Sequence, residues 1–390
     1  MMKISHYIRN IVALTACTTV VWGVGLMLGS CQRDKNLQEN EECTAVVHIE
    51  TGSPETKAVN DSEINSIAIF AFAGDALIGY VYETGLTDSG KNNFPITLTQ
   101  AGAIDFFVIA NPDPGFYCIV DGNNDVMDLS GTGTINPPEG ITPADLQLCR
   151  VKINNSQTDD GYIPMTNMPL RAGSSENRRF NITPGQTGSQ YINILVTRTV
   201  SKVKMLFIRN DDYPDNQYRI KEITLKEKIQ LAHLLDGNPD ASNYQEPPVK
   251  SIIYLNNNGA TINREFHIND DGSVPADLYI NEELYQSFGE YYLFPNIFGG
   301  NNNTGLPVSN QNDPDFYNAT IISVTYEKRT DSGYDPQYET VNNDIYIRAF
   351  SRNTCITMWC VMGADGIDRT FTYTVADWDE TVNIEVPGFN

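Results

Sequence analysis

Apolar and polar residues alternate over short stretches along most of this chain, whereas long runs with helical periodicity are scarce. Within Thr44–Glu50, Ala45, Val47 and Ile49 alternate with polar residues, and only Val46 is out of phase. This period of two predicts a strand that is buried on one face.

Most of the remaining chain is also predicted to form strands. Residues 67–72 are an uninterrupted apolar run, short enough for a strand that is covered on both faces. One short helix is predicted from Pro143 to about Arg150, because Thr142 can cap it and proline is favoured at the first helical position. Further strands are predicted at residues 94–98, 104–110, 218–226, 291–294, 321–327, 344–350, 355–362 and 370–375.

The fold class that these patterns predict is all-β. A chain of 390 residues can form two domains with good cores, and two β-sandwiches in series are the simplest arrangement for strands at this spacing. We place the domains at 44–196 and 197–390, because residues 191–209 are predicted to be a long strand, or a pair of strands, that crosses between them. Residues 236–248 and 299–316 are crowded with Asn, Asp, Pro and Gly, which predicts long surface loops.

Residues 1–30 have the pattern of a bacterial lipoprotein signal peptide. Two basic residues near the start are followed by a mostly apolar run over residues 11–28. Leu28-Gly29-Ser30-Cys31 then places small side chains before a cysteine, so we predict that Cys31 carries the lipid and that residues 31–43 form a tether at the outer membrane or cell surface. The alternative is a transmembrane anchor, since the apolar run is just long enough to span a bilayer.

The overall charge narrows the classes of partner. The chain has 26 Lys and Arg against 49 Asp and Glu, a formal net charge of −23 at pH 7. Such an acidic chain repels phosphate backbones and anionic lipid surfaces, which argues against nucleic acid or an anionic membrane surface as its partner.

Five cysteines remain once Cys17 has left with the signal peptide and Cys31 has been lipidated. An odd number cannot all pair, and no two are spaced as CxxC, which argues against a structural zinc site. We expect most of them to be small buried apolar side chains. They are Cys43, Cys118, Cys149, Cys355 and Cys360.

No motif singles out catalytic, cofactor-binding or metal-binding residues. Three histidines survive processing, and none lies in a metal-ligand or nucleophile motif. Residues 121–125 begin like a calcium loop, but Val126 and Thr132 stand where the motif needs glycine and glutamate, so an acidic surface turn is expected. We therefore expect no enzyme activity, no cofactor and no metal.

Two tryptophans belong to the predicted second domain. Trp359 lies in mid-strand among apolar residues and is expected in the core, whereas Trp378 ends a strand and is expected to cap that core. The functional alternative for either ring is a platform on which a sugar stacks.

Several segments together resemble the fimbrillin family, the subunits and accessory proteins of the protease-assembled (type V) pili of anaerobic Gram-negative bacteria. Their order and spacing across residues 28–378 give the resemblance its specificity. The segments are Leu28–Cys31, Thr56-Lys57-Ala58 after the first strand, Ile64–Phe72, Val108–Asn111, Ile163–Thr166, Thr197–Val203, Tyr291–Asn296, Arg352-Asn353-Thr354 and Val375–Trp378.

The resemblance implies two transthyretin-like (Ig-like) β-sandwich domains and export as a lipoprotein. In shaft subunits of the family a trypsin-like protease cuts after a basic residue, usually Arg, and removes the first strand; a strand of the next subunit then fills the groove. In this chain the basic residue would be Lys57. Members that keep their first strand act as anchors, and others as tip adhesins.

The C-terminal tail is a candidate donor strand. After residue 380, Val382, Ile384 and Val386 alternate with polar residues, like the apolar positions of the first strand but with larger side chains at two of three matched positions. The alternative is that residues 381–390 pair within their own domain.

The sequence thus predicts a fimbrial structural subunit that joins other copies or other fimbrillin subunits by β-augmentation, is held to the membrane by its lipid, and contributes to adhesion to a host or bacterial surface ligand. An uncleaved anchor or tip protein is the alternative within the same pilus. A monomeric glycan-binding surface lipoprotein is the rival outside it, and a secreted hydrolase comes third.

Overall fold

We describe the protein from a computed structural model. The described residues are 43–51, 63–87, 90–113, 117–127, 129, 140–153, 162–167, 177–184, 190–211, 218–229, 231–235, 244–254, 259–267, 269, 275, 281–296, 319–330, 337–347, 350–362 and 372–377. Over these residues the chain is almost entirely β-strand, with one α-helix and one short 3-10 turn, so the predicted all-β class is confirmed.

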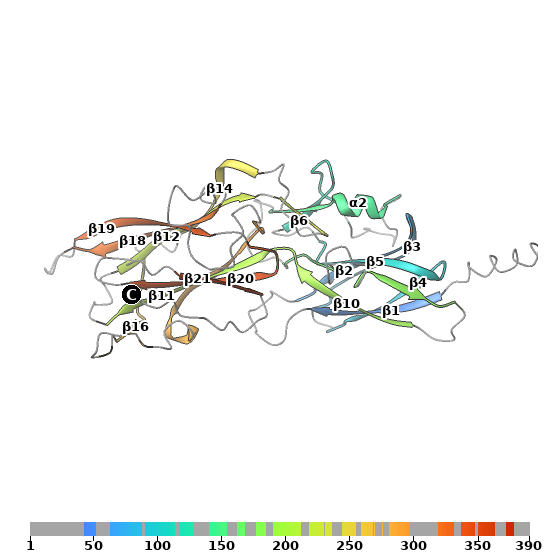
Figure 1. The fold of residues 1–390 in the computed structure, drawn as a ribbon, viewed down its shortest axis with the longest axis horizontal. Coiled ribbons are helices and arrows are strands. Elements are labelled where there is room, and N and C mark those ends of the chain that lie inside the picture. Colours follow the sequence, from blue (N-terminus) through green and yellow to red (C-terminus); the bar gives the residue numbers. More distant parts are fainter. Residues whose placement is uncertain are drawn as a thin grey trace, which may run out of the picture.

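The first half of the chain folds into one large sheet (Figure 1). Its strands are β1 (Cys43–Thr51), β2 (Ser66–Ala73), β3 (Ala76–Thr84), β4 (Asn93–Leu98), β5 (Gly102–Ala110), β8 (Met165–Thr166), β9 (Arg179–Ile182) and β10 (Gln190–Arg198). The order across the sheet is β3-β2-β5-β8-β10-β1-β4, and β9 pairs with β5. Residues 67–72 are buried throughout, as the uninterrupted apolar run in β2 predicts.

This sheet curls until its two end strands, β3 and β4, touch. The Thr99 N–H donates to the Ile78 carbonyl oxygen at 3.0 Å. At Gly79 of β3, an added Cβ would lie 2.7 Å from Leu98 Cδ2 and 2.9 Å from Thr97 O, so a side chain there would not fit. The inner face of the curled sheet encloses a core that includes Ala45, Val47, Ile49, Ile67, Ile69, Phe94, Ile96, Leu98, Phe106, Ile192, Ile194 and Val196.

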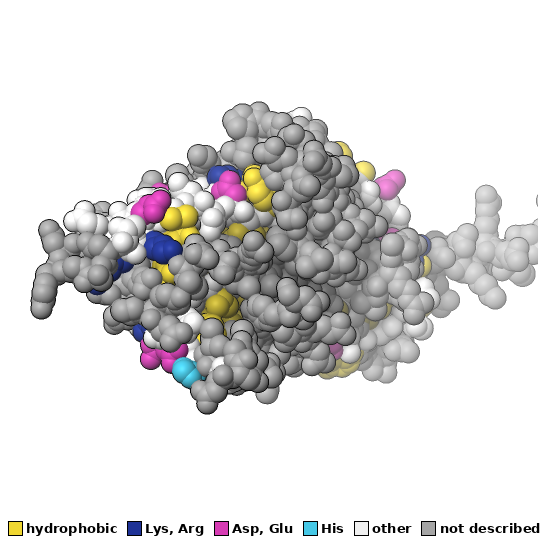
Figure 2. Space-filling model, turned by 60° about the vertical axis from the view of Figure 1, so that its left-hand side comes forward, with side chains coloured by type: hydrophobic (Ala, Val, Ile, Leu, Met, Phe, Trp, Pro, Cys, Tyr) yellow, Lys and Arg dark blue, Asp and Glu magenta, His cyan; other side chains and the backbone are white. Residues whose placement is uncertain are grey.

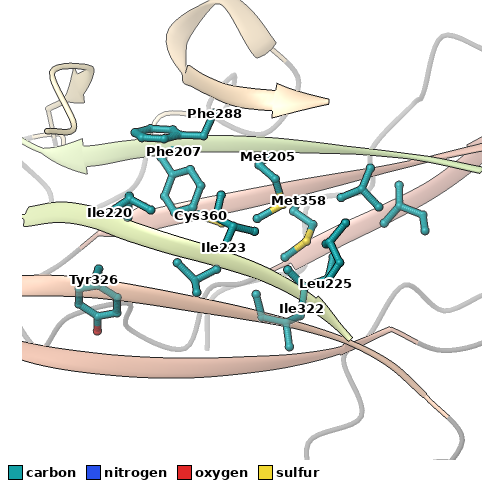
Figure 3. Packing of buried hydrophobic residues seen from close by; sticks show 14 of the residues in the cluster. Met205, Phe207, Ile220, Ile223, Leu225, Phe288, Ile322, Tyr326, Met358 and Cys360 are labelled. Atoms are coloured by element: carbon teal, nitrogen blue, oxygen red, sulfur yellow. The ribbon is translucent and has the colours of Figure 1, made fainter. Parts of the chain in front are cut away.

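The second half forms two sheets that face each other. The first has the order β16-β11-β20-β21, with β17 paired to β11, and the second has the order β14-β12-β18-β19, with β15 paired to β12. Met205 and Phe207, Ile223 and Leu225, and Met358 and Cys360 pack between them (Figure 3). The strands are β11 (Ser201–Asn210), β12 (Tyr218–Ile229), β14 (Tyr244–Tyr254), β15 (Ala260–Thr261), β16 (Glu265–Phe266), β17 (Gln286–Leu293), β18 (Thr320–Arg329), β19 (Tyr338–Ile347), β20 (Thr354–Met362) and β21 (Thr372–Asp377); the 3-10 turn η3 is Glu282–Leu284.

A small fourth sheet draws strands from both halves of the sequence. β7 (Arg150–Ile153) lies between β6 (Tyr117–Val120) and β13 (Leu231–His233), and β13 comes from beyond the predicted boundary at residue 196. Under this sheet a separate apolar cluster joins side chains of the first half to Leu234, Leu235 and Phe294. The boundary that we predicted is therefore crossed by strand pairing and by core contacts, and the division into two domains stays a prediction.

The predicted helix is confirmed as α2 (Pro143–Leu148). The Asp145 N–H donates to Thr142 Oγ1, and the Asp145 carboxylate accepts from the Thr142 N–H, so the two residues form a capping box. Residues 191–209 form the strand pair β10 and β11, which was the second of the two alternatives.

One predicted loop is wrong in part. Residues 236–248 were predicted to be loop, but β14 begins at Tyr244. Pro247 and Pro248 suggested a loop because proline cannot donate to a ladder, yet β14 is at the end of its sheet order, and the prolines lie where the register with β12 shifts between Glu227 and Ile229. Edge strands and bulges tolerate proline.

The last four predicted strands, at residues 321–327, 344–350, 355–362 and 370–375, are divided between two sheets in a way that the sequence does not show. β18 and β19 pair in one sheet, whereas β20 and β21 pair in the other, with β20 parallel to β11. Residues 299–316, the other predicted loop, lie outside the described residues.

Candidate functional site: the first strand and its neighbours

The first strand is an interior strand of its sheet. β1 runs parallel to β10, with Ala45 opposite Gln190 and Thr51 opposite Val196, and antiparallel to β4, with Cys43 opposite Leu98. Both of its backbone edges are thus used, although β1 is the first described element of the chain.

The inner face of β1 fills part of the core. Ala45, Val47 and Ile49 are buried, while Thr44 and Glu50 are exposed, so the predicted alternation is confirmed. The side chains around these three are buried and apolar as well: Phe94, Ile96 and Leu98 on β4, and Ile192, Ile194 and Val196 on β10. Removing β1 would therefore expose an apolar trough between two unpaired strand edges.

The outer face of β1 is polar and open. His48 Nδ1 lies 2.9 Å from Asn93 Oδ1. Val46, the residue that breaks the alternation, is half-buried and pairs with Pro95 on one side and Tyr191 on the other. Tyr191 is 72% exposed. Because this face contributes nothing to the core, a replacement strand would be constrained chiefly by its inward residues.

β10 is held by bonds that do not involve β1. The side chain of Asn177 donates to the Leu195 carbonyl oxygen and accepts from the Leu195 N–H, both at 2.8 Å. Thr197 and Arg198 pair with β8. This side of the trough would therefore keep its position without the first strand.

The start of β2 is fixed in the same way. Asn111, which has φ of 55°, accepts from the Asn65 N–H at 2.8 Å and donates to the carbonyl oxygens of Glu63 and Ile163 at 2.9 Å. The sequence suggested only a turn at Asn111-Pro112. Its side chain instead anchors the point at which the chain enters the sheet after β1.

Arg352 ties β10 to the second half. Its guanidinium is buried, and it donates to the carbonyl oxygens of Arg198 (2.7 Å), Thr197 (2.6 Å) and Leu234 (3.1 Å) and to Thr166 Oγ1 (2.9 Å). Five hydrogens in a planar fork suit a ring of carbonyl oxygens. In the sequence Arg352 belongs only to a segment that resembles fimbrillins, since nothing local to it indicates these distant partners.

The described cysteines are free and mostly buried, as expected. Burial raises the pKa of the Cys149 thiol to about 12, which keeps it protonated and unreactive at neutral pH. Cys355 and Cys360 lie on opposite faces of β20, and Cys360 belongs to the core between the two sheets.

Trp359 is buried, as predicted, but outside the central core. It is 2% exposed and packs edge-to-face on Tyr285 in a cluster on the outer side of the β11–β20 sheet. A ring with so little exposed surface cannot stack on a sugar, so the alternative of a sugar platform is wrong for this residue.

The sequence matches no family model and no curated protein. Solved structures similar to the chain include the fimbrilin FimA from Porphyromonas gingivalis W83 (11% identity, TM-score 0.46, covering 86% of this chain and 96% of that chain). They also include the tip fimbrial protein Mfa3 from Porphyromonas gingivalis with C-terminal truncation (12% identity, TM-score 0.44, covering 87% of this chain and 100% of that chain).

Fimbrillins are thus among the solved structures that this chain resembles.

The predicted processing and donor residues lie outside the described residues. These are Cys31, Lys57, Val382, Ile384 and Val386; Trp378, the predicted cap of the second core, lies outside the described residues as well. Their roles stay predictions.

The loop that begins like a calcium site bonds to itself. Asp121 Oδ1 accepts from the N–H groups of Asn123 (2.8 Å) and Asp125 (2.9 Å), and these bonds lower the pKa of the Asp121 carboxyl group. Arg150 donates to the carbonyl oxygens of Asp121 and Gly122. Within the described residues, no group of three or more His, Cys, Asp or Glu is placed to hold a metal ion, and no helix is long and apolar enough to cross a membrane.

The face of the second half that Figure 2 brings forward is mixed in character. Acidic and basic side chains lie close together there, and the hydrophobic side chains of the described residues show only as small separate areas. This face offers no broad apolar surface among the residues described.

Proposed function

We propose that the chain is a structural subunit of a cell-surface pilus, exported as a lipoprotein and assembled by strand exchange after its first strand has been removed, and that it contributes to adhesion. The observation that carries the proposal is the position of β1: first among the described elements, yet inserted between β10 and β4 with its apolar residues in the core. One cut after Lys57 would separate β1 from the rest of the chain, because β1 is the only described element that precedes Lys57.

The trough left by β1 suits an extended peptide. The trough would present unpaired N–H and C=O groups on both sides. It would also present the six apolar side chains that β4 and β10 contribute to the core. A strand with apolar residues at alternate positions can pair with these backbone groups and cover these side chains. This mode of binding is called β-augmentation. β10 and the start of β2 are held by Asn177, β8 and Asn111, so the β10 side of the trough would keep its position while the site is empty.

The occupant that fits this pattern is the tail of another subunit. Val382, Ile384 and Val386 present three apolar side chains at alternate positions, as Ala45, Val47 and Ile49 do in β1. Burial of such side chains is worth roughly 1.5–3 kcal/mol each, and ladder hydrogen bonds add roughly 0.5–1.5 kcal/mol each. Ordering the tail costs about 1–2 kcal/mol per residue, so binding requires a close fit.

Changing the cleavage site tests the first step. Lys57→Ala should give protein that is exported, folded and lipidated but does not polymerise, because β1 still fills its place. Polymers would be measured as ladders that resist mild SDS, alongside N-terminal sequencing for a start at Ala58. Lys221→Ala is the matched control, since Lys221 is also basic and lies on β12 of the second half, where it pairs with Glu327. Normal ladders from Lys57→Ala would point instead to an uncleaved anchor or tip protein.

Deleting Thr381–Asn390 tests the second step. If the tail is donated, the shortened chain is a stable, soluble monomer whose trough still accepts a synthetic peptide of the tail sequence. If the tail pairs within its own chain, the deletion lowers the melting temperature sharply and the peptide restores no assembly. If the chain is instead a monomeric glycan-binding protein, we expect neither cleavage nor ladders. We then expect the protein to be retained on polysaccharide columns.

A further inference from the structure

The two sides of the β1 site are held very differently. β10 has partners besides β1, namely β8, Asn177 and Arg352. β4 pairs with β1 over six register positions, and among the described residues it pairs with no other strand.

The direction of the backbone groups of β4 follows from one bond. Because the Ile49 N–H donates to the Asn92 carbonyl oxygen at 2.9 Å, the alternation of an antiparallel ladder directs the N–H groups of Phe94, Ile96 and Leu98 toward β1. The odd-numbered positions face the other way, toward β3. Thr99 follows this rule, since its N–H donates to Ile78 of β3.

The edge of β4 that faces β3 is poorly equipped to pair. Pro95 stands at one of its odd-numbered positions and has no N–H to donate. Among the described residues β4 and β3 are not paired strands, and the Thr99 N–H, just beyond the end of β4, donates to the Ile78 carbonyl oxygen. Packing at Gly79 brings the strands together but adds no ladder.

We infer that β4 is a conditional strand, held in the sheet by β1 and released when β1 leaves. Its apolar side chains Phe94, Ile96 and Leu98 would then lose both their ladder and the neighbours supplied by Ala45, Val47 and Ile49. β10 would remain as the fixed edge. The consequence for assembly rests on the proposed function. An incoming strand pairs with β10 first, and β4 then closes over it.

Hydrogen–deuterium exchange of the full chain tests this without any polymer. Val47→Asp places a carboxylate in the core and should displace β1. Val46→Pro is the milder variant, because residue 46 is on the outer face and its N–H points to β10 by the same alternation. In both variants the amides of Phe94, Ile96 and Leu98 and those of β1 should exchange at least about tenfold faster than in the unchanged protein. A factor of this size corresponds to the loss of one or two ladder hydrogen bonds. The amides of β5, β8 and of residues 195–198 in β10 should change less.

Val108→Ala is the control. Val108 lies in β5 and belongs to the same core, so this variant weakens the sheet without touching β1. It should not raise the exchange of β4 above that of β5. Two results would overturn the inference: β4 staying protected while β1 exchanges quickly, or all strands of the sheet exchanging together in both β1 variants. Either result leaves cleavage and polymerisation to be judged separately by Lys57→Ala.

Discussion

At the scale of single residues, the polar side chains that matter most are wholly or partly buried and are bonded to backbone groups of other segments. Asn111 and Asn177 each satisfy both an N–H and a carbonyl oxygen of other segments, and Arg352 satisfies three carbonyl oxygens and a hydroxyl group. Such groups are costly to bury without partners. Their partners explain why a fold made of short strands with little helix keeps its irregular segments in place.

Arg352 should therefore be among the least replaceable residues. Arg352→Met removes the guanidinium donors from the carbonyl oxygens of Thr197, Arg198 and Leu234, and we expect the free energy of unfolding to fall by about 3 kcal/mol or more. Urea denaturation would measure it. Arg179→Met is the matched control, because Arg179 pairs with Asp105 at the surface and should cost at most about 1 kcal/mol. Equal losses in the two variants would show that the Arg352 bonds contribute little.

At the scale of elements, the sheet of the first half depends on one close contact between its end strands. Gly79 lets β3 approach β4 closely enough for the bond from Thr99 to Ile78. The contact is narrow because an added Cβ would meet backbone at Thr97, and a backbone atom cannot rotate away as a side chain can.

Gly79→Ala should consequently destabilise the protein by about 1–3 kcal/mol and loosen β4. Thermal unfolding measures the first effect and exchange of the β4 amides the second. Gly122→Ala is the control, since the nearest atom to its added Cβ would be 3.8 Å away and its effect should stay within about 0.5 kcal/mol. A neutral Gly79→Ala would mean that β3 and β4 can separate at little cost.

At the scale of the whole molecule, the sheets of the first and second halves lie end to end along the long axis (Figure 1). β13 and Arg352 connect them, and β10 leads directly into β11. A force applied to the strand site would pass along β10 to the residues that Arg352 holds. In the proposed pilus subunit, this connection would carry tension along the polymer.

The attachment of the whole chain is predicted to depend on one side chain. Cys31→Ala should abolish labelling by a fatty-acid probe and leave the signal peptide uncut, because the thiol is the acceptor of the lipid. Cys43→Ala, at the next cysteine along the chain, should be labelled and processed normally. Acylation that survived Cys31→Ala would exclude the predicted lipoprotein.

The sequence by itself determined the features that depend only on residues close together in the chain. The alternation at Ala45, Val47 and Ile49, the apolar run of β2 and the capping box at Thr142 were all readable, because period and capping are local. Tertiary structure decided which strands meet. It placed β1 between β10 and β4, put β18 and β20 in different sheets, made an edge strand of a segment containing Pro247 and Pro248, and gave Arg352 its partners. These choices join residues up to 186 positions apart, and their energies come from fitting surfaces together rather than from any local pattern.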